Sequence, residues 1–184
     1  MAVRIGIIAE DLSDIEVLKI LVKKVSKKTF SISHFVGKGC GPLARKTPGW
    51  CKNLWLKGCT HILLIHDLDR NDLSNLRSKL EAILYQAPQQ FKAVVIPSEE
   101  LEAWLLSDTA AIAKALNLQK GFKEIHHPET VPSPKEYIGE MVRKISNNQR
   151  TYVNTVHNRL IAQELDVDKI KNKCPSFSGF ASFF

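Results

Sequence analysis

The stretch from His61 to Asp72, "HILLIHDLDRND", joins an apolar run to a cluster of acidic residues. An apolar run of this length is typical of a strand that is buried on both faces of a parallel sheet. Three carboxylates follow it at once, at Asp67, Asp69 and Asp72. Because like charges this close repel one another, the cluster costs stability unless something positive binds there.

On both sides of this stretch, apolar runs alternate with segments of helical periodicity. The other apolar runs predict strands at residues 3–9, 30–36 and 92–97. Apolar residues at helical spacing predict helices at residues 10–25, 42–57, 73–86 and 99–117. Strands that alternate with helices are joined by right-handed crossovers. We therefore expect an α/β fold with a parallel sheet of about four strands and helices on both faces.

Three interruptions of this pattern are expected. Pro48-Gly49 predicts a break in the second helix, because proline lacks the amide hydrogen that a helix needs. Ser107-Asp108 predicts a break in the fourth. After residue 120 a proline-punctuated loop precedes purely helical segments. The sequence thus predicts an α/β domain at residues 1–120 and a helical extension at residues 121–184, packed on the same domain.

The composition is that of a basic globular protein, with 44% hydrophobic residues and a net charge of +7. No apolar run approaches the roughly 20 residues that cross a bilayer, and the N-terminus lacks a signal-peptide pattern. We expect a cytoplasmic protein without a membrane partner. Basic clusters predict a nucleic-acid partner, DNA or RNA; they lie at 23–28, at 37–46, and at Arg143, Lys144, Arg150 and Arg159.

Acidic residues follow three of the four predicted strands. They are Glu10 after the first strand, Asp67 and Asp69 after the third, and Glu99, Glu100 and Glu102 after the fourth. Functional sites of open parallel sheets lie at the carboxyl ends of the strands. We therefore expect these carboxylates to meet at one edge, where they would suit a hard cation such as Mg²⁺ or Mn²⁺.

Each acid also has a simpler explanation. Glu10 could interact with the dipole of the following helix, and Glu99 to Glu102 could form the acidic first turn of another. Residues 67–72 could be a polar turn, in which Asp72 caps the next helix. Other site motifs are missing from the sequence: it contains no Walker A loop, no dinucleotide fingerprint, no GxSxG elbow and no common zinc spacing of its four cysteines.

The segments "IIAED" (7–11) and "IHDLDRND" (65–72) resemble the TOPRIM domain, the acidic module of topoisomerases, primases and OLD-type nucleases. A closer resemblance is to a TOPRIM-like family of unknown function, often encoded beside an AAA or ABC-type ATPase. It is carried by "IPSEELEAWLLSD" (96–108) and "CPSFSGF" (174–180). The resemblance implies a TOPRIM-like, Rossmann-like sheet. Asp11 departs from it, because many TOPRIM proteins have glycine there.

The first function hypothesis is a metal-dependent phosphodiester hydrolase, a nuclease that works with an ATPase in defence against foreign DNA. Its metal ligands would be Glu10, Asp67, Asp69, Glu100 and Glu102. Glu10 could instead act as a general base, and Lys38 would contact a phosphate oxygen. The alternative is a catalytically inactive module that binds an ATPase or nucleic acid. The sequence leaves open DNA or RNA, endo- or exonuclease action, one or two ions, and a homodimer.

Overall fold

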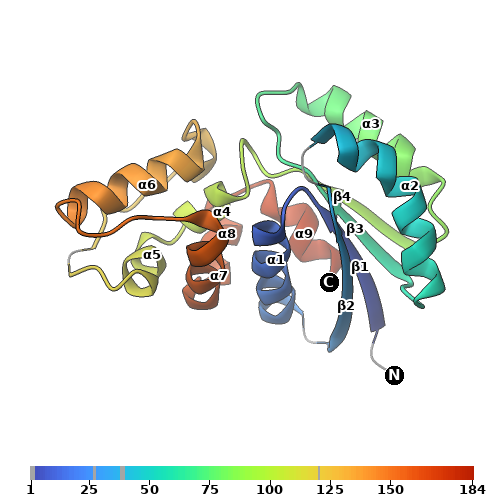
Figure 1. Cartoon of the computed structure of the whole chain (residues 1–184), viewed down its shortest axis with the longest axis horizontal. Coiled ribbons are helices and arrows are strands. Elements are labelled where there is room, and N and C mark those ends of the chain that lie inside the picture. The colour runs from blue at the N-terminus through green and yellow to red at the C-terminus, as the bar shows by residue number, and fades with distance from the viewer. Residues whose placement is uncertain (1–2, 27, 38–39, 120) are drawn as a thin grey trace.

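The computed structural model of the chain describes residues 3–26, 28–37, 40–119 and 121–184 (Figure 1). Four parallel strands form one sheet in the order β2-β1-β3-β4. Their bounds are β1 (Val3–Ala9), β2 (Phe30–Val36), β3 (His61–Ile65) and β4 (Phe91–Val95). The predicted α/β fold with a four-stranded parallel sheet is confirmed.

Helices cover both faces of the sheet. On one face lie α2 (Cys40–Leu56) and α3 (Leu73–Tyr85), and on the other α1 (Leu12–Val25) and α9 (Phe177–Phe183), as Figure 1 shows. Gly6 allows α2 to pack closely on β1. A Cβ atom there would lie 2.7 Å from Leu54 Cδ1 and 2.9 Å from Ile62 Cδ1, closer than carbon atoms approach. A larger residue would force the side chains of Leu54 and Ile62 to shift.

The predicted break at Pro48 is wrong, because α2 runs without interruption from Cys40 to Leu56. Pro48 lies on the exposed side of the helix, so the missing amide hydrogen leaves a carbonyl facing water. The opposite side buries Leu43, Thr47 and Leu54 against the sheet. This apolar contact outweighs the local cost of proline. The predicted break at Ser107-Asp108 is confirmed, since it separates two helices.

Most of the other helices lie to one side of the sheet, beyond α1 (Figure 1). They are α4 (Glu102–Leu106), α5 (Thr109–Ala115), α6 (Pro134–Ile145), α7 (Asn154–Glu164) and α8 (Val167–Lys173), with a 3₁₀ turn at Pro128–Thr130. The helix α7 packs on both α1 and α5. The expected helical character after residue 120 is confirmed, while the domain boundary stays a prediction.

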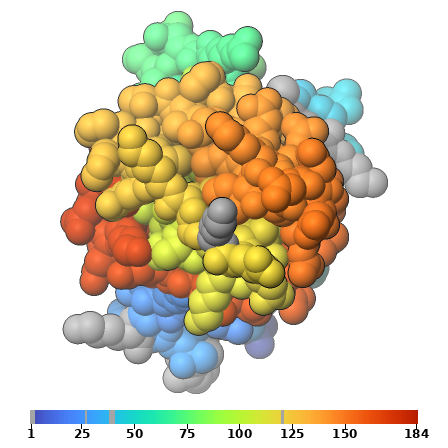
Figure 2. Space-filling view, turned by 90° about the vertical axis from the view of Figure 1, so that its left-hand side faces the viewer, coloured from blue at the N-terminus to red at the C-terminus, as the bar shows by residue number. Residues whose placement is uncertain are grey.

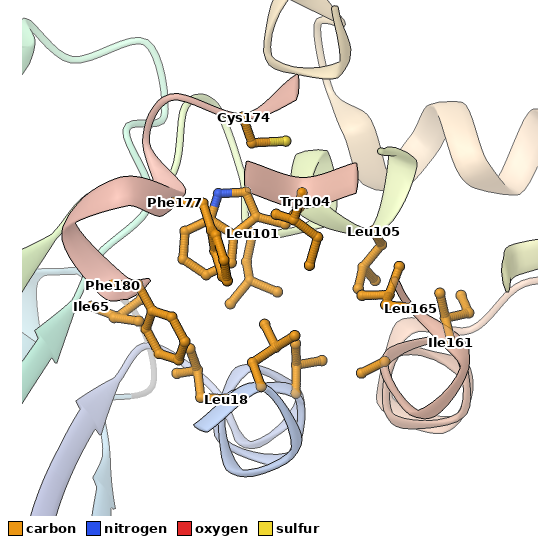
Figure 3. Packing of buried hydrophobic residues seen from close by; sticks show 14 of the residues in the cluster. Leu18, Ile65, Leu101, Trp104, Leu105, Ile161, Leu165, Cys174, Phe177 and Phe180 are labelled. Carbon is orange, nitrogen blue, oxygen red and sulfur yellow. The ribbon is translucent and has the colours of Figure 1, made fainter. Parts of the chain in front are cut away.

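One apolar core joins these helices to the sheet, as Figure 3 shows. Phe177 and Phe180 of α9 are fully buried and pack around Trp104 of α4, with ring centroids 4.9 and 5.7 Å away. Leu18 of α1 and Ile161 of α7 close the same cluster. The phenylalanines near the end of the chain are therefore explained by packing inside the protein. Among the described residues, no helix has the length and apolarity to cross a membrane.

Candidate functional site

Neighbouring strands bring Glu10 and Asp67 to the same edge of the sheet. β1 ends one residue before Glu10, β3 ends shortly before Asp67, and the two strands pair in parallel. His66 Nδ1 lies between the two segments, 3.1 Å from Glu10 Oε1 and 2.6 Å from the carbonyl oxygen of Asp67. A carbonyl oxygen only accepts, so Nδ1 carries the proton. The expected meeting of these acids at one edge is observed.

The contact with His66 leaves one oxygen of Glu10 without a hydrogen bond. The Nδ1 proton serves the nearer acceptor, the carbonyl of Asp67, and Glu10 Oε1 has no hydrogen-bond partner in the described part of the chain although it is buried. An unsatisfied buried acceptor costs on the order of 1–3 kcal/mol. This oxygen is therefore available to a cation or a proton.

The loops after β3 and β4 run side by side next to this pair. Asp67 Oδ1 accepts a hydrogen bond from the backbone N–H of Leu101 at 3.0 Å, and the N–H of Asp69 donates to the carbonyl of Glu99 at 3.1 Å. Asp69, Arg70 and Glu99 all adopt left-handed backbone conformations, with φ of 46°, 61° and 58°. Such conformations cost energy in residues other than glycine and are frequent at functional sites.

The C-terminal helices hold the two remaining predicted ligands. Glu100 Oε2 accepts a hydrogen bond from the backbone N–H of Lys135, at the start of α6, at 2.8 Å. Glu102 is 4% exposed, and its Oε1 accepts from Asn158 Nδ2 of α7 at 2.9 Å. The hydroxyl of Tyr152 in turn donates to Asn158 Oδ1. Residues 135–158 thus fix the acids that follow β4.

Asp14 joins this group, and the sequence analysis missed it. Asp11 caps α1, and the side chain of Asp14 accepts the backbone N–H of Asp11 at 3.1 Å, which completes a capping box. Asp14 is only 6% exposed. Its sequence signal, an acid on the first turn of a helix, is the ordinary signal of a cap. Proximity to Glu10 and Asp67 arises only because α1 starts at the same edge of the sheet.

Burial raises the pKa of every carboxyl group at the centre of this cluster. For Asp67 it lies well above its usual value, first because of burial and then because of four neighbouring carboxylates: Asp14, Glu102, Glu10 and Asp69. Burial, followed by Asp11 and Glu102, likewise raises the pKa of Asp14 well above its usual value. The charged form of the whole group is therefore costly without a compensating cation.

The same cause acts on the other carboxyl groups. Burial raises the pKa of Glu10, against the opposing effect of His66. Burial also raises the pKa of Glu100 and Glu102. Lys135 responds in the opposite sense: burial lowers its pKa, but nearby Glu102 and Glu100 outweigh burial and raise it overall. This lysine is a positive charge close to the cluster.

The donor set suits a hard divalent cation, because it consists of carboxylate oxygens and includes the unbonded Oε1 of Glu10. The side chains as placed are not gathered around one point: in the described ranges, no group of three acidic, histidine or cysteine residues is arranged to hold an ion. Binding would require rotation of the carboxylates. The predicted ligands are therefore brought into one neighbourhood, while their coordination stays a prediction.

The other predicted residues have different outcomes. Asp72 Oδ1 accepts the N–H of Asn75 at 2.9 Å, so Asp72 caps α3 as expected. Lys38 lies outside the described residues. In the basic cluster at 23–28, Lys24 Nζ donates to the carbonyls of Gln163 and Leu165 at 2.7 and 2.6 Å. Lys24 therefore fastens the end of α7 instead of facing a ligand.

Of the comparisons with known proteins, the one with protein families gives a match, and this match covers almost the whole chain. No curated protein and no solved structure matches the sequence. One family model, described as "Domain of unknown function (DUF4276)", matches residues 10–183. The match begins at Glu10 and includes the acidic cluster together with the helices that hold it. The chain belongs to the DUF4276 family.

Proposed function

We propose that the protein is a metal-dependent phosphodiester hydrolase, a nuclease whose ion is Mg²⁺ or Mn²⁺. The observation that carries this proposal is the burial of several carboxylates, from three separate segments, at the carboxyl edge of a parallel sheet in a chain of net charge +7. Retaining so much repulsion has a cost that a bound cation would offset. The resemblance to the TOPRIM domain supports the same chemistry.

Within this proposal, the acids differ in their freedom to bind. Glu10 and Asp67 would be the principal ligands, through the unbonded Oε1 of Glu10 and the Asp67 oxygen that does not accept the N–H of Leu101, and Asp69 lies in the adjacent exposed loop. Glu100 and Glu102 already accept hydrogen bonds from Lys135 and Asn158, so they would complete the site from outside. When bound, a divalent ion activates water and neutralises charge on phosphoryl oxygens. The unbonded Oε1 of Glu10 could alternatively accept the proton of the attacking water.

The test is calorimetric titration with Mg²⁺ and Mn²⁺, together with a cleavage assay on single- and double-stranded DNA and RNA. We expect the wild-type protein to bind an ion and to cleave at least one substrate, and Asp67→Asn to lose both properties. Asp72→Asn is the matched control, because Asp72 belongs to the same loop but caps α3. If wild type neither binds an ion nor cleaves any substrate, the proposal is wrong.

A second candidate function is a non-catalytic module that docks on a partner such as an ATPase. The observation in its favour is that Glu100 and Glu102 have partners within the protein, while the described carboxylates are not prearranged around an ion. For such a module we expect thermal stability that is independent of Mg²⁺ and Mn²⁺. We also propose that the protein acts in defence against foreign DNA, whether as a nuclease or as a non-catalytic module.

A further inference from the structure

A hollow lies at the C-terminal end of α6, which is the end away from the acidic cluster. Its volume is about 700 Å³, within the range of small-ligand sites. It is lined by the segment that follows α5 and by the end of α6 with the turn after it. Its polar lining consists of Asn117, Gln119, Lys144, Ser146, Asn147, Gln149 and Arg150. Figure 2 looks onto this end of the molecule, where α5 is yellow and α6 is orange.

The local charge around the hollow is strongly one-sided. Residues 141–163 contain four arginines and lysines and no acidic residue, and residues 109–123 contain three lysines and no acidic residue. Lys144 and Arg150 are exposed and form no ion pair with any residue that the structure describes. This contrasts with Lys169 and Lys173, which pair with Asp108 and Glu124 at 2.8 Å. The hollow therefore offers two cations to an anionic ligand.

The amide groups are equally free. The turn after α6 is held by its own backbone and by Ser146, whose hydroxyl accepts the N–H of Arg150 at 3.0 Å. Asn117 and Asn147 have left-handed backbones (φ 51° for both), which explains asparagine at these two turns. That explanation does not apply to Gln119 or Gln149. None of the four amide side chains forms a hydrogen bond within the described residues, so donors and acceptors remain for a ligand.

Apolar side chains supply the third component. Leu118 and Ile145 also line the hollow and are only partly buried. Cations, unpaired amides and a small apolar surface together match the three parts of a nucleotide: the phosphate, the hydrogen-bonding edge of the base, and the face of the base. A base inside a duplex cannot present its edge and its face in this way. The chemistry therefore favours a single strand.

The helix α6 leads from this hollow toward the acidic cluster. Another hollow, of about 410 Å³, is lined by residues 151–154 and by one side of α6, where two basic residues, Lys135 and Arg143, flank two acidic ones, Glu136 and Glu140. The two hollows share no lining residue, but their linings adjoin in the sequence, where Arg143 is followed by Lys144 and Arg150 by Thr151. Lys135, at the other end of α6, binds Glu100 through its backbone. With a rise of about 1.5 Å per residue, this stretch of the helix is roughly 15 Å long, enough for a few nucleotides.

We propose that the hollow between the ends of α5 and α6 is a nucleotide subsite, which holds one base and its phosphate of a single-stranded nucleic acid whose backbone follows α6 toward the acidic cluster. This inference rests on the proposed nuclease function for its direction. It adds a binding site and a substrate class: single strands.

The test is fluorescence anisotropy with a labelled single-stranded oligonucleotide, the duplex of the same sequence, and an abasic strand of the same length. EDTA is present throughout, so binding is measured without metal chemistry. The first variant is Lys144→Ala/Arg150→Ala. The matched control is Lys52→Ala/Lys79→Ala, which removes the same charge from exposed positions on α2 and α3, on the other face of the sheet.

We expect the first variant to bind the single strand about tenfold more weakly and to lower the salt slope by about 1.4, the value for two phosphate contacts on a single strand. The control should stay within about twofold of wild type. Gln119→Ala/Gln149→Ala should weaken binding of the normal strand with an unchanged salt slope, and should leave the abasic strand unaffected. All substituted side chains are exposed, and circular dichroism checks that the variants fold.

If Lys144→Ala/Arg150→Ala and the control Lys52→Ala/Lys79→Ala weaken single-strand binding equally, the subsite is overturned. Equal affinities of wild type for the abasic and the normal strand would overturn it as well. Duplex binding as tight as single-strand binding would overturn the choice of substrate. Single-strand binding at the hollow without metal-dependent cleavage would leave the subsite standing and refute the nuclease. Metal-dependent cleavage, together with unchanged single-strand binding by Lys144→Ala/Arg150→Ala, would support the nuclease and refute the subsite.

Discussion

Replacement of Asp67 by asparagine should stabilise the protein in the absence of metal. Asparagine has nearly the same shape, and its Oδ1 can still accept the N–H of Leu101, which Asp67 binds at 3.0 Å. The change removes a charge that burial and four neighbouring carboxylates make unfavourable. A residue selected for stability alone would not be an aspartate here. The stabilisation of Asp67→Asn therefore measures the folding free energy that the wild-type protein loses because it keeps this carboxylate.

The raised pKa of Asp67 determines the sign of this effect, and general free-energy relations give its scale. Each unit by which burial raises a carboxyl pKa corresponds to about 1.4 kcal/mol at a pH above the folded value. One kcal/mol changes the melting temperature of a chain of this size by about 2–4 °C. We therefore expect Asp67→Asn to melt above wild type in EDTA, by about 2–4 °C for each kcal/mol of repulsion that it relieves.

The pH dependence has a defined sign. Between the unfolded pKa and the raised folded pKa, folded Asp67 holds a proton that the unfolded chain has released. Stability therefore falls as the pH rises through this window, from about 4 upward, and levels off above the folded pKa. The variant lacks this loss, so its advantage over wild type should grow with pH. A divalent ion should reverse the order, since at 100 times its Kd it would stabilise only wild type, by about 2.7 kcal/mol.

The assay is thermal unfolding from pH 4.5 to 8, in EDTA and in Mg²⁺, with Asp108→Asn as the control. Asp108 is buried too, but its pKa is lowered overall: hydrogen bonds from Lys169 and from two backbone N–H groups outweigh burial. Its stabilising contribution is present above the unfolded pKa and is lost as the pH falls through the folded pKa. Asp108→Asn should therefore destabilise at pH 7. A drop in melting temperature for Asp67→Asn in EDTA would show instead that Asp67 has a structural role.

Three further substitutions test how the site and the core are built. Asn158→Ala should destabilise by about 1–3 kcal/mol, because Glu102 loses a buried donor, and urea unfolding should show a larger loss at pH 8 than at pH 5, since the hydrogen bond from Asn158 lowers the pKa of Glu102. Gly6→Ala should cost about 1–3 kcal/mol in the same assay, through the contact of its Cβ with Leu54. Phe180→Ala should cost about 3–5 kcal/mol, because its fully buried ring packs on Trp104 of α4 and lies beside Ile65 of β3; a loss under 1 kcal/mol would contradict the packing in Figure 3.

The sequence predicted the sheet well, for a physical reason. A strand that is buried on both faces is a continuous apolar run, and "HILLI" and "VRIGIIA" are such runs with the length of a strand. Parallel pairing then places all carboxyl ends at one edge, so the meeting of Glu10 and Asp67 needed no side-chain information. Pro48 shows where such reasoning ends. Whether proline breaks a helix depends on which side of the helix faces water, and that is a property of the packed structure.

The supports of the site were beyond prediction for a related reason. Asp14 has a complete local explanation as part of a capping box, so nothing in its neighbours indicates a second environment. Asn158 and Lys135 lie 56 and 35 residues away from the acids that they bind, Glu102 and Glu100. Periodicity identifies the helices that carry them but gives no angle between those helices and the sheet. Contacts of this kind are set by tertiary packing alone.

These long-range contacts join the acidic edge and the C-terminal helices into one structural unit. Asp67 is fixed by the start of α4, Glu100 by the start of α6, and Glu102 by α7. An ion that draws the carboxylates together must therefore act on all three helices, and binding at α6 must in turn act on Glu100. Coupling between two sites is reciprocal, so a strand bound along α6 would change the affinity for the ion by the same factor by which the ion changes the affinity for the strand. The proposed metal site would accordingly depend on residues 10–158 together, and the first strand with its glutamate would supply only part of it.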